Sequence, residues 1–150
     1  MISFYVNVII SNVLERTYFT PMKVLLIDSL AEECTEILEK AGIQAVSRPG
    51  IPLDELKEEI KDYEGVILRS GARIAEEVLT NAHRLRAICR AGVGVDNVDI
   101  EGATKRGIVV MNTPEGNTIS AAEHTIALLF AMARKVSQAH KSLQKGEWER

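Results

Sequence analysis

Leu85-Arg-Ala-Ile-Cys89 precedes the turn Arg90-Ala-Gly-Val-Gly-Val-Asp-Asn-Val-Asp99, and these two segments decide the fold. The first is apolar enough for a buried strand, and residues 98–106 can form a helix, so two glycines lie at a strand-to-helix turn. In open α/β sheets such turns bind ligands, because the crevice forms at the carboxyl ends of the strands, where free N–H groups of the next helix face it. Glycine suits this position because it has no Cβ to keep a ligand from the backbone.

The same unit, a short apolar run followed by an amphipathic stretch, occurs five times from Met22 onward. This alternation favours parallel strands, because each helix returns the chain to the same direction. Several runs are apolar throughout, which predicts a sheet covered on both faces. We therefore predict an α/β, flavodoxin-like doubly wound parallel sheet. The predicted strands are residues 23–28, 43–47, 65–69, 85–89 and 108–111.

Helix ends are predicted from capping residues. Residues 29–32 and 120–123 have the spacing of a capping box, the first before a helix that Gly42 closes and the second before a long helix. Asn97 is the predicted N-cap of the helix that Gly107 ends. The other two predicted helices cover residues 53–63 and 75–82.

The composition is that of a soluble globular protein, with 46% hydrophobic and 26% charged residues among 150. A net charge of -3 favours neither nucleic acid nor an anionic membrane as partner, although a small anion can be held locally. No run approaches the roughly 20 apolar residues that span a bilayer. With two cysteines and no Cys/His cluster at ligand spacing, the sequence predicts a cytoplasmic protein without a structural metal.

Both ends of the chain depart from the repeating pattern. Residues 1–21 lack the features of a signal peptide, and we expect an extension before a folded unit that begins at Met22, with an edge strand over residues 4–10 as the alternative. The long helix from Ile119 is apolar nearly all round in its middle, so it needs cover on more than one side, between domains or at a subunit interface. The polar end around Trp148 suggests a chain cut within a larger architecture.

The turn Gly92-Val-Gly94 does not complete a dinucleotide fingerprint, because Asn97 replaces the third glycine. Two interpretations stay open: a tight turn that needs a positive φ, or a nest of backbone N–H groups that binds a carboxylate. Arg69 ends another strand at the same edge, and its fork suits a carboxylate or phosphate, although a surface ion pair is the ordinary fate of an arginine. Ser70 adds a hydroxyl and Arg73 a second cation.

Six motifs in order along the chain carry a family resemblance. They are Val66-Ile-Leu-Arg-Ser70, Arg90 to Asp99, Gly107-Ile-Val-Val-Met-Asn-Thr-Pro114, Gly116-Asn117, Ala121-Ala-Glu-His-Thr125 and Gly146-Glu-Trp-Glu-Arg150. Together they resemble the amino-terminal part of the D-isomer-specific 2-hydroxyacid dehydrogenases, and most closely the members that act on 3-phosphoglycerate. The resemblance runs from about Met22 to Arg150 without an obvious gap.

What the resemblance implies is a two-domain, NAD-dependent oxidoreductase that oxidises 3-phospho-D-glycerate to 3-phosphooxypyruvate, the entry step of serine biosynthesis, as a homodimer or tetramer. In the family the N–H groups of the glycine turn receive the substrate carboxylate, and the positions of Val93 and Asn117 also lie near the cofactor. The substrate-binding positions that match are Arg69, Ser70, Gly92, Val93, Gly94 and Asn117.

The resemblance also implies an amino-terminal fragment. Residues 1–21 are then an extension, 22–117 the substrate domain, and 118–150 an inter-domain helix with the start of a truncated nucleotide-binding domain. The segment around Trp148 would lie near a dimer interface. The family's nucleotide fingerprint and its catalytic Arg, Glu and His fall beyond Arg150. We therefore expect no catalytic residue in this chain, NAD binding mainly by the absent domain, and no activity of the chain alone.

Two alternatives stay open at this point. One is another D-2-hydroxyacid dehydrogenase, of the glyoxylate or hydroxypyruvate reductase type, since the contacts to the phosphate end of a substrate cannot be read from these motifs. The other is a non-catalytic anion-binding module of the same fold, which keeps the turn and Arg69 and performs no chemistry.

Overall fold

A computed structural model of the chain describes residues 21–148. The contacts between residues divide the chain into two units, one ending at Gly116 and the other beginning at Asn117, and each is described by itself. The extension expected over residues 1–21, like the alternative strand over residues 4–10, lies outside the described residues except for Pro21.

Five parallel strands form the sheet of the first unit, in the order β2-β1-β3-β4-β5. This is the strand order of flavodoxin-like doubly wound folds, so the predicted fold is confirmed. Each strand overlaps its predicted range, with one or both ends shifted by one or two residues. The strands are β1 (Lys23–Leu26), β2 (Gln44–Ser47), β3 (Gly65–Leu68), β4 (Ala87–Arg90) and β5 (Val109–Asn112).

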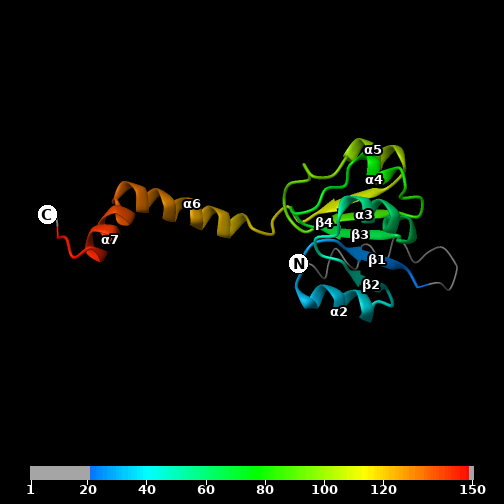
Figure 1. Cartoon of the computed structure of the whole chain (residues 1–150), viewed down its shortest axis with the longest axis horizontal. Helices are drawn as coiled ribbons and strands as arrows, with labels where there is room; N and C mark the ends of the chain where they lie inside the picture. The colour runs from blue at the N-terminus through cyan, green and yellow to red at the C-terminus, as the bar shows by residue number, and fades with distance from the viewer. Residues whose placement is uncertain (1–20, 149–150) are drawn as a thin grey trace. The chain divides into compact units, whose positions relative to one another are not determined.

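One face of the sheet is covered by α2 (Glu32–Lys40), as Figure 1 shows. Side chains alternate along a strand, so Val24 and Leu26 of β1 point to this face. There they pack against Leu38, which is completely buried.

The opposite face is covered by α3, α4 and α5 (Figure 1). Leu25 and Ile27 of β1 point this way and share a core with Leu56 of α3 and Leu79 of α4. Burying one such side chain contributes roughly 1.5–3 kcal/mol to stability, so this face supplies much of the driving force for folding. The bounds are α3 (Leu53–Glu59), the 3-10 turn η1 (Ile60–Asp62), α4 (Glu76–Leu79) and α5 (Ile100–Lys105).

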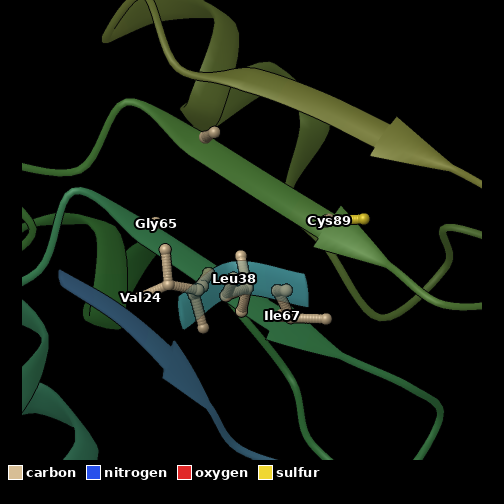
Figure 2. Close-up of a pocket in the computed structure, with 7 residues that line it drawn as sticks. Val24, Leu38, Gly65, Ile67 and Cys89 are labelled. Atoms are coloured by element: carbon tan, nitrogen blue, oxygen red, sulfur yellow. The ribbon is translucent and has the colours of Figure 1, made fainter. Parts of the chain in front are cut away.

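A small cavity of about 10 Å³ lies between α2 and strands β1, β3 and β4 (Figure 2). Its walls include Val24, Leu38, Ile67 and Cys89 and carry no charged group. A Cβ at Gly65 would lie 3.0 Å from a methyl group of Val24, so glycine lets β1 and β3 pack closely here. The cavity is a gap in apolar packing and offers nothing to an ionic ligand.

The start of α2 differs from the predicted one. The helix begins at Glu32, and its N-cap position is Ala31, whose side chain makes no capping hydrogen bond. The capping box over residues 29–32 is therefore wrong. Ala31 has an extended backbone conformation, and the carboxylate of Asp28 accepts from the loop that follows β3. Gly42, with φ +75°, closes this helix as predicted.

The second unit contains α6 (Thr118–Ala133) and α7 (Val136–Gln144). The predicted single helix is interrupted, because Lys135 adopts a left-handed conformation with φ 53°. No capping box forms over residues 120–123, since the N-cap position is Asn117, three residues earlier than predicted. Neither helix has a buried residue. Among the described residues, no helix combines the length and apolarity needed to cross a membrane.

Candidate functional site

The carboxyl ends of β3 and β4 lie next to each other at one edge of the sheet. Leu68 pairs with Arg90 in the parallel register, and the N–H of Ala91 donates to the carbonyl of Leu68 at 2.8 Å. Arg69 follows Leu68 directly. The structure therefore places the loop that begins at Arg69 beside the turn that contains Gly92 and Gly94.

Two polar side chains hold the loop over residues 69–72. The N–H groups of Arg69 and Ala72 both donate to Oδ2 of Asp28, at 2.6 and 3.3 Å. The carbonyl oxygens of the same two residues both accept from Nδ2 of Asn97, each at 2.6 Å. The side chains of Arg69 and Ser70 are left exposed. Within residues 21–148, none of the salt bridges involves Arg69.

The glycines of the turn do not have the positive φ that one interpretation required, since the glycines with positive φ in the described chain lie elsewhere. That interpretation is wrong. A Cβ at Gly92 would lie 2.7 Å from Cζ of Arg90, so a larger residue would displace the end of the Arg90 side chain that packs over this position. A Cβ at Gly94 would lie 2.9 Å from Oδ1 of Asp96. Both glycines thus allow close approach of a side chain, and neither is strained.

The backbone N–H groups of the turn are partly free. The N–H of Gly92 donates to the carbonyl of Arg90 at 2.9 Å. The N–H groups of Val93 and Gly94 make no hydrogen bond with any group in the described part of the chain, and both residues are exposed. The carbonyl of Val93 accepts from Nδ2 of Asn112 at 2.7 Å, which anchors the turn to β5. Two adjacent N–H groups are therefore available to an anion.

Three residues of this edge were not predicted as parts of a site. Arg90 is half-buried, and its Nε is buried without a hydrogen-bond partner among the described residues. Asp28 and Asn97 hold the Arg69 loop. The sequence offered only a weak signal for them: Asp28 follows a strand, and Asn97 was predicted as a helix N-cap. That prediction is wrong, because its amide binds the carbonyl groups of the Arg69 loop instead.

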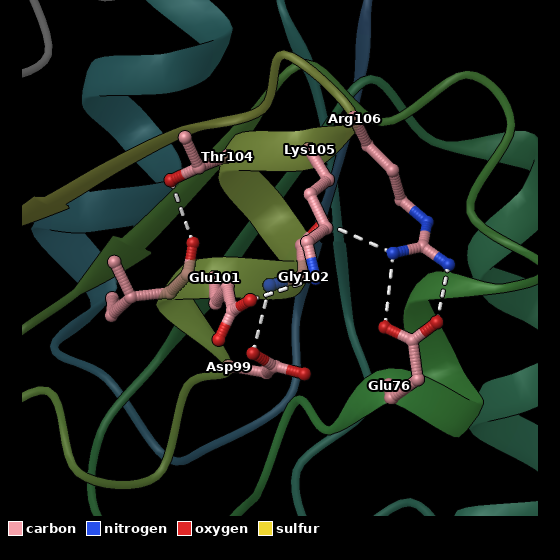
Figure 3. A network of polar contacts seen from close by, with 8 residues as sticks. Glu76, Asp99, Glu101, Gly102, Thr104, Lys105 and Arg106 are labelled. Carbon is pink, nitrogen blue, oxygen red and sulfur yellow. Dashed lines mark hydrogen bonds and ion pairs between the residues drawn. The ribbon is translucent and has the colours of Figure 1, made fainter.

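Asp99 is the actual N-cap of α5, and its Oδ1 accepts from the N–H of Gly102 at 2.8 Å. Figure 3 shows the network around it. Arg106 donates from both Nη atoms to the carboxylate of Glu76, at 3.0 and 2.6 Å, and this hydrogen bonding raises the pKa of Arg106. The network joins α5 to α4 and so fixes the helix that follows the turn.

Cys34 and Cys89 do not supply a nucleophile. Burial raises the pKa of Cys34. Burial, and to a smaller extent the neighbouring Cys34, raises the pKa of Cys89 to about 11. Both thiols are therefore protonated at neutral pH, whereas thiolates are the reactive and metal-binding form. Over residues 21–148 there is also no group of three His, Cys, Asp or Glu side chains placed to hold a metal ion.

Asn117, the remaining predicted site residue, begins the second unit. It occupies the N-cap position of α6, where its carbonyl accepts from the N–H of Ala121 at 2.9 Å and from the hydroxyl of Ser120 at 3.0 Å. Its side chain makes no capping hydrogen bond. Its role near substrate and cofactor stays a prediction.

The catalytic-domain model of the D-isomer specific 2-hydroxyacid dehydrogenases matches residues 24–147. The chain belongs to this family. The match includes all of the sheet except Lys23, and both helices of the second unit. It covers the six sequence motifs as far as residue 147, together with the segments that connect them.

Two relatives that are similar to this chain have the same name. D-3-phosphoglycerate dehydrogenase of Archaeoglobus fulgidus is 48% identical over 129 residues, which are 86% of this chain and 24% of that protein. The enzyme of the same name from Homo sapiens is 46% identical over 128 residues, 85% of this chain and 24% of that protein. The chain thus spans about a quarter of the length of these relatives.

A solved structure is similar as well. The 3-phosphoglycerate dehydrogenase of Entamoeba histolytica, with NAD+ bound, superimposes with a TM-score of 0.67 and 39% identity, over 75% of this chain and 39% of that one. The family therefore includes an enzyme that binds NAD+ and acts on 3-phosphoglycerate.

Proposed function

We propose that the chain is the substrate-binding part of an NAD-dependent dehydrogenase that oxidises 3-phospho-D-glycerate to 3-phosphooxypyruvate. One observation carries the proposal: Arg69, which is outside the ion pairs of the described chain, begins the loop after β3, and this loop lies beside the turn after β4 that has two free N–H groups. A guanidinium fork and a backbone nest are both complementary to a carboxylate. The relatives named above support 3-phosphoglycerate as the substrate.

Each residue then has a distinct part in binding. The N–H groups of Val93 and Gly94 donate to the substrate carboxylate, and Arg69 supplies the charge-assisted contact. Ser70 offers a hydroxyl beside Arg69. Anchoring the acid end in this way holds the 2-hydroxyl in a defined position, which is the part of catalysis that a binding domain can contribute. The exposed side chain of Val93 is assigned to the border of the nicotinamide.

The residues of this chain do not fit the pyrophosphate of NAD. The glycine turn lacks a third glycine at Asn97, and α5 has only six residues. The N–H of Gly102 in its first turn already donates to the carboxylate of Asp99, which would repel a phosphate. We therefore assign no step of hydride transfer to these residues, and we expect the chain alone to reduce no NAD+.

Binding of 3-phosphoglycerate to the whole chain tests the proposal. We expect the backbone resonances of Val93 and Gly94 to shift in an NMR titration, and Arg69→Ala to weaken binding about tenfold or more, because a hydrogen bond to a charged group contributes roughly 1.5–3 kcal/mol. Arg86→Ala is the matched control, since it removes the same charge from an exposed residue at the amino end of β4.

The ligand panel separates the alternatives. Tighter binding of glyoxylate or hydroxypyruvate than of 3-phosphoglycerate would favour a reductase of the other substrate type. Equal binding of inorganic phosphate and 3-phosphoglycerate would favour an anion-binding module. Equal losses in Arg69→Ala and Arg86→Ala would show that only the overall charge matters, and would contradict the proposed site.

A further inference from the structure

We propose that Asp28 and Asn97 are positioning residues that set the distance between Arg69 and the free N–H groups of the glycine turn. The inference rests on the proposed function, because it concerns how the two halves of that anion site are held in register. Neither residue needs to touch the substrate. They act on it through the backbone of residues 69–72.

Asp28 holds the loop from one side. Its Oδ2 accepts two hydrogen bonds, from the N–H of Arg69 at 2.6 Å and from the N–H of Ala72 at 3.3 Å. Gly71, between them, makes this approach possible, because a Cβ at that position would overlap Oδ1 of Asp28. One carboxylate thus fixes both ends of a four-residue loop relative to the end of β1.

Asn97 holds the same loop from its carbonyl side. Its Nδ2 donates to the carbonyl oxygens of Arg69 and Ala72, both at 2.6 Å. Its Oδ1 is buried and has no hydrogen-bond partner among the described residues. Within the described chain the Asn97 amide therefore acts only as a donor of two hydrogen bonds. These bind the carbonyl groups of Arg69 and Ala72, the same two residues whose N–H groups donate to Asp28.

Asn97 also belongs to the segment that carries the free N–H groups. Its own carbonyl accepts from the N–H of Ile74 at 2.9 Å, and the N–H of Asp99 donates to the carbonyl of Ile74 at 2.8 Å. These bonds form a short parallel bridge between Ile74 and Val98. Movement of Asn97 would therefore move the Arg69 loop relative to Val93 and Gly94. A site loosened by about 1 Å loses much of its binding.

A double-mutant cycle on the full 150-residue chain tests this role, with 3-phosphoglycerate as the probe and calorimetry as the measurement. We expect Asn97→Ala to raise the Kd about tenfold when Arg69 is present, and less than about twofold in the Arg69→Ala background. Interactions that act through one another give such non-additive changes. Asn97→Asp replaces the donating Nδ2 by a carboxylate oxygen that repels both carbonyl oxygens, and is expected to weaken binding further.

A conservative variant adds a second readout. Asp28→Asn keeps a side-chain oxygen that can accept both N–H groups, so we expect a Kd within about twofold of the original, whereas Asp28→Ala should resemble Asn97→Ala. In the ligand-free chain, Asn97→Ala should shift the backbone amide resonances of Arg69, Ala72, Val93 and Gly94. The remaining resonances of the sheet show whether each variant is folded.

The outcomes separate this inference from the proposed function. An equal loss of binding from Asn97→Ala in both backgrounds, or unchanged amide resonances on both sides of Asn97, would overturn the positioning role and leave the anion site intact. Absence of 3-phosphoglycerate binding by the unsubstituted chain would instead overturn the proposed function, and the positioning role with it.

Discussion

Tyr63 and Cys89 are uncharged groups that the folded chain protects from ionisation. Burial, together with its hydrogen bond to Glu59, raises the pKa of Tyr63 from 10.0 to about 12. Burial raises the pKa of Cys89 from 9.0 to about 11. At neutral pH both are protonated in the folded and unfolded chain alike, so they change the free energy of unfolding only when the solution is alkaline enough to ionise the unfolded chain, and ionisation then disfavours the folded state.

The free energy of unfolding is therefore expected to fall between about pH 9 and pH 12. In that window the unfolded chain releases protons that the folded chain still binds, and stability decreases as pH rises. Urea denaturation at a series of pH values measures this. Tyr63→Phe removes one titrating group and should flatten the decrease above pH 10.0. The same slope in the variant and the parent would show that Tyr63 is not protected.

Arg69 and the glycine turn are the parts of the candidate site that could be predicted from the local sequence. An arginine at the end of a strand and two glycines at a strand-to-helix turn are local signals, and both were predicted. For Gly92 the interpretation by a positive φ is wrong and the interpretation by carboxylate binding stays a prediction, while the Arg90 side chain that packs over it follows no periodic pattern. Asp28 and Asn97 gave no comparable signal, since their partners are distant in the chain.

Among the secondary-structure elements, the carboxyl ends of two helices were predicted correctly and three N-caps were not. Gly42 and Gly107 close their helices with positive φ, as predicted, because that backbone conformation depends on the residue itself. N-caps were predicted wrongly at residues 29–32, at 120–123 and at Asn97. A side-chain cap requires a side chain that no distant group binds, and Asn97 is bound by the loop after β3.

The contact between α4 and α5 depends on a glycine. A Cβ at Gly102 would lie 2.7 Å from Oδ2 of Asp99 and 2.8 Å from Oε2 of Glu76. We expect Gly102→Ala to displace both carboxylates: loss of the helix cap costs about 1–2 kcal/mol, the higher helix propensity of alanine offsets up to about 1 kcal/mol of this, and the free energy of unfolding falls by about 0.5–1 kcal/mol. Chemical denaturation measures this change.

The matched control for Gly102→Ala is Lys105→Ala on the same helix. Lys105 is exposed, and its one salt bridge within residues 21–148 is to Glu101 at the i,i+4 spacing, so its loss should change stability by less than about 0.5 kcal/mol. If Gly102→Ala were no more destabilising than this control, the network in Figure 3 would contribute little to the packing of α5.

At the scale of the whole molecule, the two units differ in how their apolar residues are used. Leu25, Leu68 and Ile88 in the sheet are completely buried. In α6, by contrast, Ile119 and Met132 are 75% and 74% exposed, and no residue of the helix is buried. Helices gain most of their stability from packing an apolar face, so α6 has little support within the described chain.

Hydrogen exchange tests this difference. We expect backbone amides of β1 and β3 to exchange slowest and those of α6 to exchange with little protection, since protection follows buried contacts and cooperative packing. The measurement should be made at several protein concentrations. Protection of α6 equal to that of β3 at every concentration would contradict the prediction, and protection that rises with concentration would indicate that copies of the chain cover it.

By itself, the sequence determined the α/β class, the parallel direction of five strands, and the edge where Arg69 and the glycine turn occur. These features follow from local periodicity and from the rule that successive βα units return the chain to the same side. The tertiary structure alone decided which groups hold that edge in place. Asp28 and Asn97 lie 41 and 28 positions from Arg69 along the chain, and hydrogen bonds over such distances depend on how the strands are ordered in space.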